Sequence, residues 1–87
     1  RSHVRMRILN FLAENSGMCF NAHEITVALG ITYDNVIGAL NGASSKYSKE
    51  YSLVEMGLVS RSQPGPGHNA VTYTITALGF NAAAAAR

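Results

Sequence analysis

The stretch that decides the fold is Leu29-Gly30-Ile31-Thr32. Gly30 can adopt the left-handed backbone conformation that ends a helix, and Ile31 can fill the angle between two helices. Thr32 is a good N-cap for a second helix. The four residues therefore predict two short helices that meet at a tight corner.

The helix that follows this corner is predicted to run to about Ser45 and to have one apolar face. Val36, Ile37 and Leu40 are spaced to form its inward face. The outward face carries mainly small and amide side chains, which suit a DNA groove: Thr32, Tyr33, Asn35, Gly38, Asn41 and Ser45. The same helix contains Asp34 and no lysine or arginine, so a typical guanine-reading side chain is missing. A solvated helix face is the alternative interpretation.

Apolar spacing also predicts a helix near the N-terminus. Its apolar positions are Val4, Ile8, Leu9 and Leu12, with Phe11 as a further candidate. Gly17 follows Asn15 and Ser16 and supplies a stop.

A short strand and another helix are predicted between this stop and the corner. The apolar run 18–20 indicates a small strand in which Cys19 faces the core. Asn21 is a good N-cap with Glu24 at the third helical position, so the next helix is expected to run to about Leu29.

The C-terminal third predicts a β-hairpin followed by a helix. Gly57 breaks the segment Leu53–Arg61 before a first strand, and the loop from Ser62 to Ala70 holds two prolines and two glycines, which a strand ladder excludes. Residues 71–75 alternate apolar and polar side chains as a returning strand does. The segment Ala77-Leu78-Gly79-Phe80 then begins a closing helix.

These segments together resemble the winged helix-turn-helix family of DNA-binding domains, of the transcription-regulator type. The resemblance covers roughly residues 5–80 and rests on the corner at 29–32 and on the strand-to-helix segment 73–79. It implies an α+β fold with a three-helix core and a small antiparallel β-hairpin wing. A short C-terminal helix is compatible with this fold. On this basis the winged helix-turn-helix domain spans residues 4–80. Residues 1–3 are then a tag remnant or domain edge, and residues 81–87 a frayed terminus or residues added for expression.

The chain departs from the family pattern between residues 42 and 52, which are longer than the usual spacing from recognition helix to wing. This stretch either extends the helix, with Tyr47 and Tyr51 one turn apart, or forms a loop after a shorter helix. It brings Lys46, Tyr47 and Lys49 into one region. Contact with the DNA backbone would use such a group of basic and aromatic side chains. Packing of both tyrosines on the edge of the core explains them at least as well.

The resemblance implies how DNA would be bound. The helix at about 32–45 would enter the major groove, and the wing at about 61–70 would lie on the backbone or the minor groove. Asn35 and Asn41 can read adenine through bidentate amide contacts, and Tyr33 can touch a phosphate or a thymine methyl. The predicted DNA-binding residues are Thr32, Tyr33, Asn35, Asn41, Ser45, Lys46, Lys49, Arg61, Gln63, His68 and Asn69. Arg5 and Arg7 also fall in a segment that a winged helix presents to phosphates.

Composition limits the remaining choices. The 87 residues can build one core, and no apolar run approaches the ~20 residues that a membrane span requires. The net charge of +2 and the pI of about 9.0 favour a polyanionic partner only weakly. A single cysteine and the lack of an apolar signal segment favour a cytoplasmic protein.

Catalysis is not indicated by this sequence. Cys19 and His23 are four residues apart, but a structural zinc ion needs four ligands. A nucleophile, a base and an orienting acid cannot be assembled from segments predicted to lie together. We therefore expect no enzyme activity and no cofactor or metal.

The expected partner is double-stranded DNA, with a homodimer or a larger parent protein as further assemblies. The alternative function is a winged helix used as a protein-interaction or assembly module. A continuous positive face would favour DNA binding, and scattered charge would favour the alternative.

Overall fold

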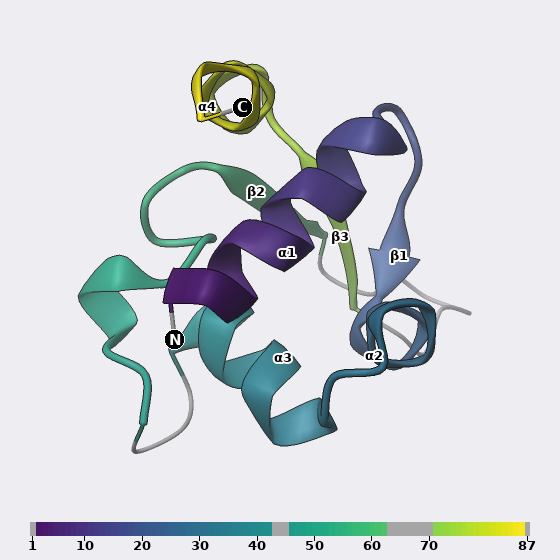
Figure 1. The fold of residues 1–87 in the computed structure, drawn as a ribbon, viewed down its shortest axis with the longest axis vertical. Coiled ribbons are helices and arrows are strands. Elements are labelled where there is room, and N and C mark those ends of the chain that lie inside the picture. The colour runs from purple at the N-terminus through teal and green to yellow at the C-terminus, as the bar shows by residue number, and fades with distance from the viewer. Residues whose placement is uncertain (1, 43–45, 63–70, 87) are drawn as a thin grey trace.

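The structure, a computed structural model, describes residues 2–42, 46–62 and 71–86. Within these ranges the chain forms four α-helices, a single 3₁₀ turn and one three-stranded antiparallel sheet (Figure 1). The elements are α1 (Ser2–Glu14), β1 (Phe20–Asn21), α2 (Ala22–Leu29), α3 (Tyr33–Asn41), η1 (Lys49–Tyr51), β2 (Val59–Ser62), β3 (Thr72–Ile75) and α4 (Ala77–Ala85). The α+β class predicted from the sequence is confirmed.

The sheet is ordered β1-β3-β2, so β3 lies in the centre. Tyr73 of β3 pairs with Phe20 on one side and with Arg61 on the other. The hairpin register runs from Val59 opposite Ile75 to Ser62 opposite Thr72. The ends of β2 and β3 at Ser62 and Thr72 thus lie away from α4, which begins directly after β3 (Figure 1).

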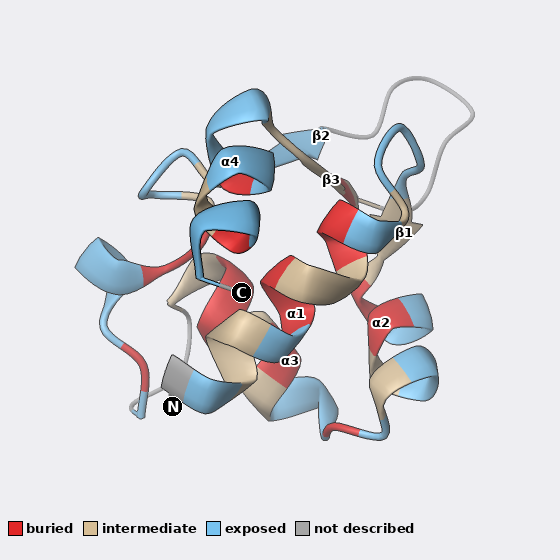
Figure 2. Ribbon diagram, turned by 45° about the horizontal axis from the view of Figure 1, so that its top comes forward, coloured by how far each residue is buried: buried red, intermediate tan, exposed pale blue. Residues whose placement is uncertain are grey.

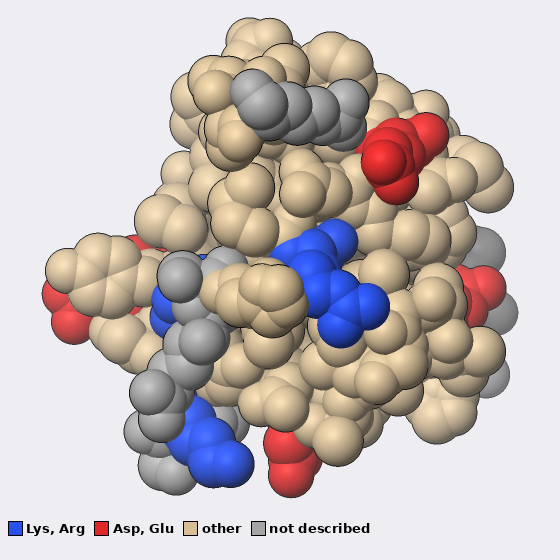
Figure 3. All heavy atoms as spheres, in the orientation of Figure 1, with Lys and Arg blue, Asp and Glu red and all other residues tan. Residues whose placement is uncertain are grey.

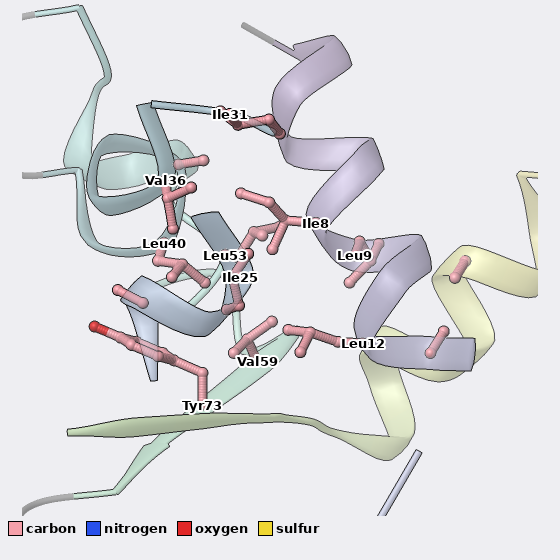
Figure 4. Close-up of a cluster of buried hydrophobic side chains, with 14 of the residues drawn as sticks. Ile8, Leu9, Leu12, Ile25, Ile31, Val36, Leu40, Leu53, Val59 and Tyr73 are labelled. Carbon is pink, nitrogen blue, oxygen red and sulfur yellow. The ribbon is translucent and has the colours of Figure 1, made fainter. Parts of the chain in front are cut away.

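The core lies between α1, α3 and the sheet. Helix α1 crosses the middle of the molecule, with α3 near one of its ends and α4 near the other (Figure 1). Buried positions face inward on these elements, whereas α2 and α4 expose their outer surfaces (Figure 2). The side chains that meet at the centre are Ile8, Leu12, Ile25, Val36, Leu40, Leu53, Val59 and Tyr73 (Figure 4).

The corner between α2 and α3 has the predicted geometry. Gly30 has a φ of 66° and donates its N–H to the Thr26 carbonyl oxygen at 2.9 Å. Ile31 is buried in the angle between the helices, and the Thr32 hydroxyl accepts from the Asn35 N–H at 3.4 Å. The three short-range roles assigned to Gly30, Ile31 and Thr32 are confirmed.

The start of α2 carries a complete capping box. The Asn21 side chain accepts from the Glu24 N–H, and the Glu24 carboxylate accepts from the Asn21 N–H, both at 2.8 Å. Asn21→Ala should lower the free energy of unfolding by about 1 kcal/mol, because the first of these bonds is lost. Asn21→Ser is the control that retains a capping oxygen, and chemical denaturation compares the two. A loss in the serine variant as large as in the alanine variant would contradict the capping role.

The first strand differs from its prediction. It spans Phe20–Asn21 and not 18–20, because only these two residues pair with β3. The Phe20 ring packs on Phe11 at 4.9 Å between centroids, which anchors this strand to α1. Met18 and Cys19 precede the anchor and are exposed, so the prediction that Cys19 faces the core is wrong.

The helix after the corner is shorter than predicted. It ends at Asn41, where Gly42 has a φ of 68° and donates its N–H to the Gly38 carbonyl oxygen at 2.8 Å. A methyl group at Gly42 would overlap the backbone of Lys49, so the returning chain packs closely against this glycine. Of the two alternatives for residues 42–52, the structure therefore has the shorter helix.

The chain after α3 returns along the end of the same helix. The N–H groups of Leu53 and Val54 donate to the carbonyl oxygens of Ala39 and Leu40 at 2.9 and 3.1 Å. These bonds satisfy carbonyl groups that the end of a helix leaves without partners. They attach the connection to α3 and direct it into β2.

Both ends of the described chain are helical. Helix α1 already includes Ser2, and residues 81–85, expected to be a frayed end, belong to α4. Ala83 is fully buried in the core cluster. In the described ranges no helix has the length and apolar character needed to cross a bilayer.

Candidate nucleic-acid interface

A hollow of about 680 Å³ lies between α2, α3 and the hairpin, and we call it the α3–hairpin hollow. Its lining residues are Asn21, Ala22, His23, Tyr33, Ile37, Asn41, Arg61, Val71 and Tyr73. Residues 33, 37 and 41 are four apart and share one face of α3. This face forms one wall, the strands form another, and the first turn of α2 closes the hollow.

Tyr33 is a predicted site residue that is open to a partner at this hollow. It is the first residue of α3 and is 51% exposed. Its ring lies 6.4 Å from that of His23, with a tilt of 55° between the planes. Thr32 and Asp34 on either side are also exposed, so the first turn of α3 is accessible.

Sequence reasoning missed His23 as a member of this site. His23 is exposed and lines the hollow from the first turn of α2. The signal was present, because a helix capped at Asn21 places His23 in its exposed first turn. What the sequence does not contain is the proximity of this turn to Tyr33 across the corner.

The two asparagines predicted to read adenine are both engaged inside the protein. The Asn41 amide nitrogen donates to the Tyr73 hydroxyl at 2.8 Å. The Asn35 carbonyl oxygen accepts from the Tyr47 hydroxyl at 3.1 Å. Bidentate reading of adenine uses both polar atoms of an amide in one orientation, and each of these internal bonds already restricts the orientation of its amide.

Gly38 was predicted on the outward face of α3, and this is wrong. It is buried, and a methyl group there would overlap the Tyr47 ring. Tyr47 itself is 4% exposed, as expected from packing on the core edge, whereas Tyr51 is 59% exposed. The face of α3 that remains open is therefore the one toward the hollow.

The predicted backbone cations are divided between two regions. Arg61 is exposed on β2 and lines the hollow. Lys46 and Lys49 are exposed in the connection after α3 and do not line the hollow. The structure thus brings Tyr33, Asn41 and Arg61 together at the hollow, and it places both lysines outside the hollow.

The two arginines of α1 make internal contacts. An Arg7 guanidinium nitrogen donates to the Leu29 carbonyl oxygen at 2.8 Å, at the carboxyl end of α2. The Arg5 guanidinium lies over the Tyr47 ring, 5.3 Å from its centroid. On the face seen in Figure 3, the atoms of the described lysines and arginines form separate groups and not one continuous patch. The described basic side chains on this face are therefore scattered.

Four predicted site residues, Ser45, Gln63, His68 and Asn69, lie outside the described residues. Among the residues that are described, no group of three or more His, Cys, Asp or Glu could hold a metal ion. The candidate interface therefore consists of polar, aromatic and cationic side chains around the hollow.

Two helices joined by a tight corner lie beside an antiparallel hairpin, with a partly polar hollow between them, in this small α+β domain. The family model described as EarA-like matches residues 1–85, and the chain belongs to this family. Neither a search of curated proteins nor a search of solved structures found a match.

Proposed function

We propose that this chain is a winged-helix domain that binds duplex DNA. In this proposal α3 enters the major groove and the β2–β3 hairpin is the wing. The observation that carries the proposal is the accessible first turn of α3, which opens onto the hollow with Arg61 of the hairpin on its wall. A recognition helix in a major groove uses the N-terminal residues of the helix for base contact.

The side chains of this first turn suit base contact without a lysine or arginine. Tyr33 offers a ring for a thymine methyl and a hydroxyl for a phosphate. Asp34 can accept from the amino group of cytosine, although its charge opposes close approach to phosphates. We therefore assign sequence preference to the first turn of α3 and backbone attachment to Arg61.

The proposal also explains the hollow. A strand of DNA that passes from α3 to the wing must cross the space between them. Arg61 and His23 line this space from β2 and α2, and both can donate to phosphate oxygens. The expected cytoplasmic location and a possible second copy of the chain are part of the same proposal and rest on the sequence alone.

An amide titration tests the proposal directly. The isotope-labelled domain is titrated with a mixed-sequence duplex at low and at physiological salt. We expect shifts in residues 32–42 and 59–62 that become smaller with salt, because counterion release makes phosphate contacts salt-dependent. No shifts at low salt would overturn the proposal.

Arg61→Ala should weaken binding by a similar factor on every duplex. Loss of one phosphate contact should also reduce the slope of log affinity against log salt by about 0.9. Arg61→Lys is the matched control, because it retains the charge and should retain the slope. Fluorescence anisotropy across a salt series measures both quantities, and an unchanged slope in the alanine variant would remove Arg61 from the backbone contacts.

A protein-interaction module is the second candidate function. Helix α3 has no cationic residue, and Val27, Leu78 and Phe80 are large apolar side chains with 75%, 59% and 45% exposure. Exposed apolar side chains are a feature of protein-binding surfaces. This candidate predicts negligible binding of duplex DNA at physiological salt, so the same titration separates the two functions.

A further inference from the structure

One hydrogen bond joins the two walls of the α3–hairpin hollow. It runs from the amide nitrogen of Asn41, the last residue of α3, to the hydroxyl of Tyr73 in β3, over 2.8 Å. Both residues line the hollow, and they are 32 positions apart in the sequence. The bond therefore links helix α3 to the central strand of the sheet at the hollow.

Tyr73 is held firmly enough to serve as an anchor. Its side chain is 3% exposed and belongs to the core cluster, where Figure 4 shows it beside Val59 of β2. Its backbone lies in the central strand of the sheet, paired on both sides. A hydroxyl fixed in this way can orient a partner side chain without moving itself.

Asn41 is poorly placed to act as a base reader. One N–H of its amide is donated to Tyr73, so the orientation of the amide is restricted and only the second N–H is left for another acceptor. A base contact that required the amide to turn would break this bond and would leave the hydroxyl of Tyr73, a residue that is 3% exposed, without this partner. A lost partner in a buried position costs more than the bond contributes when it is formed.

A second tyrosine holds α3 in the same way from another side. The Tyr47 hydroxyl donates to Asn35 at 3.1 Å, and the Tyr47 ring covers Gly38. Helix α3 is thus attached through one amide to the connection that follows it and through the other to the sheet. The two attachments restrict rotation of α3 about its own axis.

We propose that Asn41 is a positioning residue, whose bond to Tyr73 sets the spacing and orientation of α3 relative to the hairpin. Discrimination between DNA sequences then depends on this bond, although neither side chain contacts a base. The inference rests on the proposed function, because the spacing matters for a ligand that both elements contact. It assigns to Asn41 a role opposite to the reading role that its position on the helix suggested.

Tyr73→Phe and Asn41→Ala test the assignment as a pair. The probes are a duplex enriched by the wild-type domain from a randomised pool and a mixed-sequence duplex, and the readout is the ratio of the two affinities. We expect each variant to lower this ratio by a similar factor, about 3- to 10-fold for one hydrogen bond. The double variant should lose no more than either single variant, because both changes remove the same bond.

Two results would contradict the positioning role of Asn41. If Asn41 reads a base, Tyr73→Phe will leave the ratio unchanged, while Asn41→Ala will lose preference at one base pair. An unchanged ratio in both variants, with only a lower melting temperature, would show a purely structural bond and overturn the proposal. Tyr51→Phe is the matched control, because Tyr51 is exposed and lies outside the hollow, and it should change nothing.

A measurement on the free protein keeps this inference separate from the proposed function. Residual dipolar couplings of backbone amides report the orientation of α3 relative to β2 and β3 without DNA. We expect Tyr73→Phe to change this orientation, or to let α3 move among several orientations so that its couplings become smaller. Unchanged couplings would overturn the positioning role. If the wild-type domain binds no duplex, the proposed function fails, while the couplings still decide whether the bond sets the geometry.

Discussion

Tyr47→Ala should lower the free energy of unfolding by about 3–5 kcal/mol, the range for removal of a large buried aromatic side chain. The ring is 4% exposed and covers Gly38, so its removal leaves a cavity against α3 that the glycine cannot fill. The variant also loses the hydrogen bond to Asn35 and the contact with the Arg5 guanidinium. Urea denaturation followed by circular dichroism measures the loss.

Two further variants keep this prediction decisive. Tyr47→Phe retains the ring and should cost only about 1 kcal/mol, the contribution of one hydrogen bond, which remains measurable if the alanine variant does not fold. Tyr51→Ala is the control from the same connection, because Tyr51 is 59% exposed and should have a small effect. Similar losses for Tyr47→Ala and Tyr51→Ala would contradict the difference in burial.

Gly79→Ala should destabilise the protein by about 1–3 kcal/mol, as overpacking of a tight contact does. A methyl group at Gly79 would overlap the Leu58 carbonyl oxygen and would lie 2.9 Å from the Ile75 Cδ1 atom. The oxygen belongs to the backbone and accepts from both the Thr76 N–H and the Thr76 hydroxyl, at 3.2 and 3.0 Å. It cannot move away without disturbing the N-cap of α4.

The direction of the stability change in Gly79→Ala is informative, because alanine favours helix formation more than glycine does. In an exposed helix the same substitution would stabilise by roughly 0.5–1 kcal/mol. Asn81→Ala is the control, since Asn81 is exposed on α4 and should follow helix propensity alone. Thermal unfolding of both variants separates close packing from propensity, and a stabilised Gly79→Ala variant would show that α4 does not pack closely on Leu58.

The local signals in the sequence were sufficient for most of the secondary structure. The caps at Asn21 and Thr32, the left-handed Gly30, the break at Gly57 and the alternation in the returning strand were all predicted. Each of these features depends on residues within about four positions of one another. For this reason they could be inferred without knowledge of the rest of the fold.

The candidate site was predicted only in part. Tyr33 and Arg61 lie at one hollow as expected for a helix and a wing, but His23 was missed and the lysines lie elsewhere. Asn35 and Asn41 were correctly placed on this helix, and the structure adds that each amide makes a hydrogen bond within the protein. The partners of these two amides lie 12 and 32 positions away in the sequence. Periodicity in the sequence does not predict such distant contacts.

The sequence by itself determined the helix boundaries set by caps, the corner between α2 and α3 and the α+β class, because short-range hydrogen bonds and backbone preferences act wherever the chain is placed. Tertiary structure alone decided what packs against Gly42 at the end of α3, which of Tyr47 and Tyr51 is buried and what the amides of α3 bind. The space at Gly42 is taken by the backbone of Lys49, and the hydroxyl that engages Asn41 comes from the centre of the sheet. These outcomes depend on which distant segments come into contact, and contact between distant segments is a property of the packed core.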